Sequence, residues 1–441
     1  MKIKTLTLAL LVSLCTMAQD FNQTKMDSLF SVIENNDKGM GSISIVEDGK
    51  EVYQNTIGFL NIEKQIPINK NTKFRIGSIS KTFTATIIMK LVEQDKLSLD
   101  TKLAKFFPQI TNAEKITIEH LLKHRSGIYN FTNANDYASW MEQPIKREEL
   151  LKKIAANENV FEPDEKTEYS NANFVLLSFI AEDVSGKKFS VILEEFITQP
   201  CELEHTYFGS KINTTNNEAL SYNKLDDWKL ATETDMSIPL GAGSIVSTPK
   251  DLNIFLHGLF KHKIVSEESL KKMIQVQEGT GIGMGLFQVP FYDKKAFGHT
   301  GGIDGFQSNA FYFPDENVSV TYLSNGVVMS MNDILIGVLS IYFGREYELP
   351  EFKEPLKLAS EELDKYLGVY SGPDLPLKLT ITKKDNILMG QGTGQSPFPL
   401  EAYDEHKFKF DQASLKIEFL PNENKMILKQ GGGVFELTKE E

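Results

Sequence analysis

The chain has 441 residues, more than one small core needs, and this length predicts two or three domains. Its hydrophobic share of 41% and charged share of 24% are typical of a soluble globular protein. The formal net charge of −13 argues against nucleic acid and anionic membrane surfaces as partners.

Residues 1–18 have the pattern of a secretory signal peptide. Lys2 and Lys4 precede an apolar run, Leu6 to Leu14, and small residues up to Ala18 offer a cleavage site. The run is too short to span a bilayer, and no later segment reaches the necessary length. We therefore expect a periplasmic or secreted protein, with no stable membrane insertion after the signal is removed.

Strand patterns flank a helical middle in residues 19–345. Residues 40–60 alternate around a turn and predict a hairpin, and a helical stripe runs from about Ser78 to Lys96. Residues 117–260 are mostly helix and loop, residues 296–325 return to strands, and a helix follows. This order predicts an α/β (α+β) fold: an antiparallel sheet built from both ends of the segment and flanked by helices, with a helical subdomain inserted.

The composition of the sequence changes after Arg345. Residues 346–360 carry prolines and many charges, which is typical of a linker. From residue 361 to 441, short alternating runs separated by turns predict a small all-β meander or barrel. This last segment shows no catalytic cluster.

The first candidate motif is Ser78-Ile79-Ser80-Lys81. Gly77 lets the backbone turn just before the predicted helix, so the Ser78 N–H would lie at a helix N-terminus, where a developing oxyanion is favoured. Lys81 falls on the same helix face and can act as a base for the serine only if burial keeps it partly neutral. The same four-residue pattern starts at four other serines, so a capping serine with a surface lysine is the alternative.

The second candidate motif is Tyr169-Ser170-Asn171, between a turn and a predicted helix. A tyrosine hydroxyl near an amine can shuttle a proton to a leaving group. The Asn171 amide can hold both a lysine and a substrate carbonyl. The alternative is a helix-capping loop with Asn171 as the cap, a role that is compatible with the first.

The third candidate motif, His299-Thr300-Gly301-Gly302, occurs once and opens a predicted strand. The two glycines would leave the strand edge bare, so a substrate backbone could add alongside it, and the Gly302 N–H could be a second oxyanion donor. His299 would supply a polar or cationic group, with a histidine preceding a simple β-turn as the alternative.

Together the three motifs resemble the serine β-lactamase and penicillin-binding protein superfamily. The resemblance covers about residues 25–345, extends to Phe74–Ser78, Leu121–Ile128 and Gly241–Thr248, and is closest to the branch of class C β-lactamases, D-Ala-D-Ala carboxypeptidases and esterases. It implies a β-lactamase/transpeptidase-like fold, acylation of Ser78, base duty shared by Lys81 and Tyr169, and substrate binding by Asn171 and residues 299–302. The C-terminal segment resembles the lipocalin-like β domain appended to such hydrolases.

The substrate stays open at this point. Carboxypeptidases of this branch hold a free carboxylate with an arginine shortly before the third motif, and residues 279–298 contain none. We expect a serine hydrolase acting through a covalent acyl-enzyme on an ester, amide or D-amino-acid peptide. The alternatives are a β-lactamase or D-Ala-D-Ala carboxypeptidase, and a non-catalytic protein that binds peptidoglycan fragments.

We expect no cofactor and no metal. His120 and His124 have the spacing of helical metal ligands, but Leu121 replaces the glutamate of a His-Glu-x-x-His site. Both histidines are therefore predicted to have structural roles at a helix end. The sequence leaves the oligomeric state undetermined.

Overall fold

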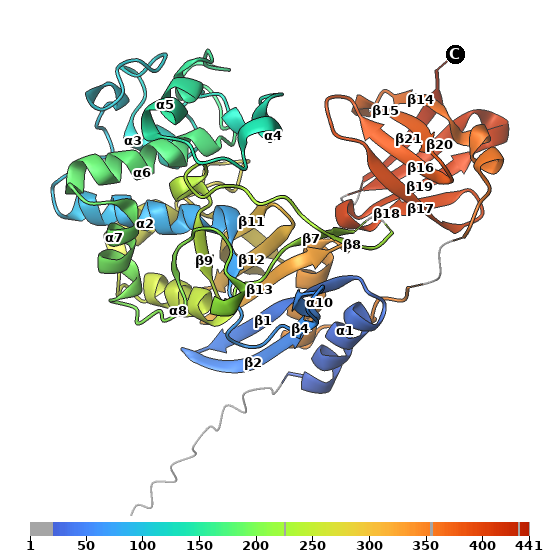
Figure 1. Cartoon of the computed structure of the whole chain (residues 1–441), viewed down its shortest axis with the longest axis horizontal. Coiled ribbons are helices and arrows are strands. Elements are labelled where there is room, and N and C mark those ends of the chain that lie inside the picture. The colour runs from blue at the N-terminus through green and yellow to red at the C-terminus, as the bar shows by residue number, and fades with distance from the viewer. Residues whose placement is uncertain (1–20, 225, 353–355, 431–432, 441) are drawn as a thin grey trace, which may run out of the picture.

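A computed structural model describes residues 21–224, 226–352, 356–430 and 433–440 of the chain. It consists of a large α/β part followed by a small β-barrel (Figure 1). The predicted signal peptide, residues 1–18, lies outside the described residues. The domain boundaries at residues 345 and 360 stay predictions.

The main sheet has six antiparallel strands and confirms the predicted fold class. Its first hairpin pairs with the last strand of the α/β part, so the sheet does join both ends of that segment. Alternating apolar residues face cores on both sides, which fixes the register because a one-residue slip would turn every side chain over. In spatial order the strands are β10 (Phe287–Phe291), β11 (Lys294–Ile303), β12 (Phe306–Phe313), β13 (Val318–Val327), β1 (Gly39–Glu47) and β2 (Lys50–Ile57).

Two helices cover one face of the sheet, and the inserted helices lie over the other (Figure 1). Phe30 of α1 (Gln23–Asn35) and Val338 of α10 (Met331–Tyr342) pack in one core with Phe311 of β12. The helices between β2 and β10 are α2 (Ser80–Glu93), α3 (Ile118–Leu122), α4 (Tyr137–Trp140), α5 (Arg147–Ala155), α6 (Asn171–Ser185), α7 (Phe189–Leu193), α8 (Pro249–Phe260) and α9 (Glu267–Ile274).

Short strands and helical turns connect these elements. The small sheets are built from β3 (Phe59–Asn61) and β4 (Ile66–Pro67), from β5 (Phe74–Arg75), β9 (Ile245–Ser247) and β6 (Tyr207–Phe208), and from β7 (Tyr222–Lys224) and β8 (Trp228–Leu230). The single turns are η1 (Gly77–Ile79), η2 (Leu103–Lys105), η3 (Phe131–Asn133), the π-turn η4 (Glu194–Thr198), η5 (Thr214–Asn216) and η6 (Leu240–Ala242).

The C-terminal segment is a closed barrel of eight antiparallel strands, as its alternating runs predicted. Buried Tyr366, Tyr370, Phe408 and Phe419 fill its interior. Closure pairs the first strand with the last, which leaves no open edge. Its elements are η7 (Ser360–Tyr366), β14 (Gly368–Gly372), β15 (Leu375–Lys384), β16 (Ile387–Gly392), β17 (Phe398–Asp404), β18 (Lys407–Phe410), η8 (Asp411–Ala413), β19 (Leu415–Leu420), η9 (Pro421–Glu423), β20 (Lys425–Gln430) and β21 (Gly433–Lys439).

The barrel contacts the α/β part beside α10. Gln412 Nε2 donates to the Val327 carbonyl oxygen at 3.1 Å, and Ser414 Oγ donates to an Asp333 carboxylate oxygen at 2.8 Å. These bonds hold the η8 turn of the barrel against the start of the last helix. Across the described ranges, no helix combines the length and the apolar character that crossing a bilayer requires.

Candidate active site

The chain turns sharply just before Ser78, between β5 and α2. The Ile76 N–H donates to the Ile245 carbonyl at 3.0 Å, and Gly77 then adopts a positive φ of 51°, which a glycine tolerates without strain. Ser78 sits in the 3-10 turn η1, and the α-helix proper begins at Ser80 rather than at Ser78. The tight turn still leaves Ser78 at the N-terminal end of the helix, where unpaired N–H groups favour negative charge.

Lys81 is fully buried, and its amine is surrounded by uncharged oxygens. The Nζ atom lies 2.9 Å from Ser78 Oγ, 2.8 Å from Asn171 Oδ1 and 2.8 Å from the Ala242 carbonyl oxygen. An ammonium satisfies all three oxygens as a donor. A neutral amine satisfies Asn171 and Ala242 with its two N–H groups and accepts the Ser78 hydroxyl proton with its lone pair. The site therefore accommodates both protonation states of the lysine.

Burial holds the pKa of Lys81 well below its usual range, because a charged amine loses its hydration there. The rings of Tyr169 and Phe174, centred 4.8 and 5.8 Å from Nζ, favour the ammonium and oppose this effect. Such contacts are worth about 1–2 kcal/mol, and the loss of hydration of the buried amine outweighs them. A lysine in this environment can take a proton from a serine at neutral pH.

Asn171 is oriented by two polar neighbours. Its backbone N–H donates to Asn130 Oδ1 and its Nδ2 donates to Thr132 Oγ1, each at 3.1 Å, which turns its Oδ1 towards Lys81. The alternative role of Asn171 as the helix cap is wrong by one residue: Ser170 holds the cap position and α6 begins at Asn171. The asparagine needs its side chain for the lysine, so it lies in the first turn instead.

Tyr169 stands beside Ser78, and its side chain is half-buried. Burial raises its pKa, against the opposite influence of a hydrogen bond with Ser78. The raised pKa favours the protonated phenol, which can relay a proton. Its ring stacks on His124 at a centroid distance of 4.4 Å.

His124 is a site residue that we had assigned only a structural role at a helix end. It is buried, and its Nδ1 accepts the Ser170 N–H at 3.1 Å, which locks the backbone next to Tyr169. Burial, reinforced by nearby Lys81 and His299, holds its pKa well below the usual range, so the ring is neutral. His120 keeps its predicted structural role by capping α3 through the Thr117 N–H.

His299 faces the same region from β11. Burial lowers its pKa to about 3, and Lys81 acts in the same direction when it is protonated, so His299 is a neutral polar group rather than a cation at physiological pH. In the neutral ring its Nδ1–H can donate to the Thr300 carbonyl, which leaves Nε2 as an acceptor. Phe287 stacks on the imidazole at 4.2 Å, and the Tyr169 ring lies 6.2 Å away.

Gly301 and Gly302 bring β11 against the Ser78 turn. A Cβ on Gly301 would lie 2.1 Å from the Ile76 carbonyl oxygen, and one on Gly77 would lie 2.8 Å from the Gly302 nitrogen. Close backbone approach, more than a bare edge, thus explains glycine at 301. Strand β10 begins at Phe287, opposite Gly298, so its pairing with β11 stops there. Residues 299–303 pair with β12 on one side only. Strand alternation places the Thr300 side chain on the other face of the sheet from His299.

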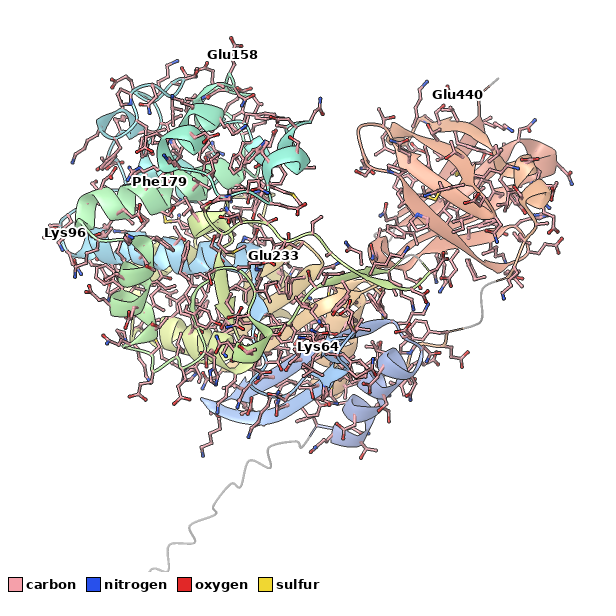
Figure 2. The ribbon with its side chains drawn as sticks, in the orientation of Figure 1. Lys64, Lys96, Glu158, Phe179, Glu233 and Glu440 are labelled. Carbon is pink, nitrogen blue, oxygen red and sulfur yellow. The ribbon has the colours of Figure 1, made fainter. Side chains whose placement is uncertain are left out.

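An ion pair ties the two backbone segments together. Arg75 is buried and bonds the Asp304 carboxylate at 3.0 Å and the Glu233 carboxylate at 2.7 Å. Asp304 also accepts the N–H and the hydroxyl of Thr234. Arg75 precedes Ser78 by three residues and Asp304 follows Gly302 by two, so this network, whose Glu233 is labelled in Figure 2, ties the Ser78 turn to the end of β11.

The structure brings residues of the three predicted motifs close together, and sequence reasoning missed the residues that support them, namely Asn130, Thr132, Ala242 and Asp304. No local pattern marks these four. The Gly241–Thr248 and Leu121–Ile128 segments, noted only through the family resemblance, were the one available signal.

Comparison with known proteins decides the family. The model of the family described as Beta-lactamase matches residues 32–336, more than half of the chain. The chain belongs to the Beta-lactamase family. It is a serine hydrolase, as predicted.

Three relatives of this Beta-lactamase family member show how far the likeness extends. Penicillin-binding protein 4* of Bacillus subtilis (strain 168) is 24% identical over 428 residues, which cover 90% of this chain and 94% of that protein. Teichoic acid D-alanine hydrolase of Staphylococcus aureus is 26% identical over 298 residues, or 64% of this chain and 70% of that one. The structure of the octameric penicillin-binding protein homologue from Pyrococcus abyssi is 26% identical with a TM-score of 0.65, covering 94% of this chain and 99% of that one.

Proposed function

We propose that this hydrolase cleaves esters or amides of D-amino acids through an acyl-enzyme on Ser78. The main observation behind this proposal is the 2.9 Å contact between Ser78 Oγ and the buried Lys81 amine, whose other two partners are neutral oxygens. The likeness to a teichoic acid D-alanine hydrolase supports a D-alanyl ester as the first substrate to test.

The proposed acylation moves one proton in two steps. Ser78 Oγ attacks the substrate carbonyl while Lys81 Nζ takes the hydroxyl proton. The C–O or C–N bond then breaks, and Tyr169 passes the proton from Lys81 to the departing oxygen or nitrogen. Water later attacks the acyl-serine by the reverse proton route and releases the acid.

Backbone N–H groups of Ser78 and Gly302 would stabilise the tetrahedral oxyanion. The tight approach of Gly77 to Gly302 supports this role, because it brings the backbone of the Ser78 turn close to the Gly302 nitrogen. The Asn171 side chain would hold Lys81 in place and contact a carbonyl group of the substrate. Neutral His299 and the exposed part of the third motif, Thr300 to Gly302, would contact the substrate.

A neutral His299 and the absence of arginine from residues 279–298 favour this proposal over a carboxypeptidase. A substrate with a free carboxylate beside the scissile bond would meet no cation from that segment. Amides and esters without such a carboxylate meet no penalty.

The test is intact-protein mass spectrometry after exposure to D-alanine methyl ester, L-alanine methyl ester, p-nitrophenyl acetate and a fluorescent penicillin. We expect a mass increment on Ser78 and fastest turnover with the D-alanyl ester. Ser78→Ala should show neither, while Ser185→Ala, which removes a serine of the same Ser-x-x-Lys pattern, should behave like the parent. Unchanged turnover in Ser78→Ala would refute the proposal and favour a binding protein.

We also propose that the protein acts in the periplasm or outside the cell. The signal-peptide pattern of residues 1–18 supports this location. N-terminal sequencing of the protein recovered from a fractionated host should start at Gln19, and recovery of the full-length chain from the cytoplasm would contradict it.

A further inference from the structure

A second cavity begins at the third motif and runs away from Ser78. It has a volume of about 820 Å³, within the range of small-molecule sites. It lies between the outer end of the main sheet and α10, and Gln412 of the barrel contributes to its rim. The barrel meets this region through Gln412, which bonds the Val327 carbonyl at the end of β13, and through Ser414, which bonds Asp333 in α10.

The cavity shares three residues with the candidate active site. Thr300, Gly301 and Gly302 belong to its lining. Register places Gly302 opposite Gln307, and hence on the face of the sheet that carries Phe311 and α10. A Cβ added to Gly302 would meet nothing within 4 Å, so this end of the cavity is open beside the proposed oxyanion donor.

The walls combine a group of apolar side chains with uncharged polar ones such as Gln307, Asn309 and Asn332, and they carry almost no charge. Of the described residues that line the cavity, Asp304 alone is ionisable, and it is fully engaged by Arg75 and Thr234. A charged ligand would find no counter-ion there, whereas a hydrocarbon group would be removed from water. The apolar wall consists of Val289, Phe291, Phe311, Phe313, Leu335 and Leu339.

We propose that this cavity is a subsite for an uncharged apolar substituent of the substrate, an alkyl or aryl group several carbons long. The proposal rests on the proposed function, because the substituent is anchored by the scissile carbonyl between Ser78 and Gly302. The cavity is continuous with the candidate active site, because residues 300–302 line it. A group that enters the cavity from the scissile carbonyl passes this strand, so the expected occupant is a part of the substrate itself. The substituent belongs either to the acyl group or to the leaving group.

Two ester series separate these sources. One varies the acyl chain of p-nitrophenyl esters from acetate to octanoate, and the other varies the alcohol of D-alanine esters from methyl to octyl. Full burial of a methylene group is worth about fourfold in binding, so we expect kcat/KM to rise at least about tenfold along one series. The series that rises identifies the source. Flat profiles in both series would overturn the proposal.

Variants of α10 place the effect in this cavity. Ile336 lines the cavity and is 38% exposed, so Ile336→Trp can add volume at modest risk to folding. It should abolish the long-chain gain and leave the acetate and methyl esters unchanged. Val191→Trp, at a site of similar exposure on α7 outside the cavity, should keep the gain. Retention of the full gain in Ile336→Trp would contradict the proposal.

A second variant protects the test against misfolding. Leu335→Ala enlarges the cavity and should shift the optimum towards longer chains, while an unmoved optimum would count against the subsite. Failure of the proposed function is distinguishable, because short esters would then acylate no form of the protein. Failure of the subsite alone leaves short-ester acylation of Ser78 intact.

Discussion

Two buried basic side chains flank Ser78, and they differ in their partners. Arg75, three residues before it, bonds the carboxylates of Asp304 and Glu233. Lys81, three residues after it, contacts only uncharged oxygens. Arginine stays charged in proteins and a buried charge needs a counter-charge, so the first pair fixes geometry. A lysine without a carboxylate can lose its proton, so the second group can do chemistry.

The largest expected effect comes from replacing the unpaired base. Lys81→Met should lower kcat about 10³-fold, because Ser78 then has no proton acceptor. Lys81→Arg should fail to restore activity, since a guanidinium keeps its proton. Lys90→Met is the matched control and should keep the parent rate. Lys90 lies on the same helix as Lys81, and its amine donates to the Ile264 carbonyl. Steady-state ester hydrolysis measures all three.

Removing a carboxylate from the ion pairs of Arg75 should lower the stability of the fold more than the rate of catalysis. Asp304→Asn leaves Arg75 with an incomplete set of counter-charges, and we expect a loss of about 3 kcal/mol in unfolding free energy by urea titration. The exposed pair of Asp293 with Arg345 offers the control, since Asp293→Asn should lose less than about 0.5 kcal/mol. Equal losses in the two variants would show that the buried network does not hold the turn.

Two glycines near Ser78 test whether the close approach of the two backbone segments matters for the rate. Gly301→Ala would drive a methyl group into the Ile76 carbonyl, and displacement of the oxyanion strand should lower kcat about 30-fold, or about 2 kcal/mol. Gly302→Ala meets open space and should change kcat by less than about threefold. Esters with a small acyl group suit this measurement. Similar rates for both variants would contradict the close approach.

Converting the unpaired lysine into a paired one tests the comparison most directly. Asn171→Asp places a carboxylate on Lys81, which should raise the lysine pKa by about 1–3 units. The base works when neutral, so activity is present above the lysine pKa and is lost as pH falls through it. The acid limb of kcat/KM should therefore move to higher pH, with about tenfold less activity at pH 7 and recovery in alkaline buffer. An unmoved limb would mean that Lys81 is not the titrating base.

Much of the fold could be predicted from the sequence because periodicity reports local structure directly. The hairpin at residues 40–60, the helix after Ser78 and the closing helix all appear within a few residues of their predicted places. The barrel strands β14, β16 and β17 are harder to predict, because glycines or a proline interrupt their alternation. Their pairing comes from closure of the barrel, which no single strand encodes.

The sequence by itself determined the chemical groups of the site, their order along the chain and the family they resemble. Tertiary structure decided which ones are neutral and how they face one another. Burial, and not residue type, lowers the pKa of Lys81 and of His299. His124, Asn130 and Ala242 join the site only because folding brings distant segments to the lysine and the tyrosine. Proton affinity and orientation depend on surroundings, and those surroundings come from segments far apart in the chain.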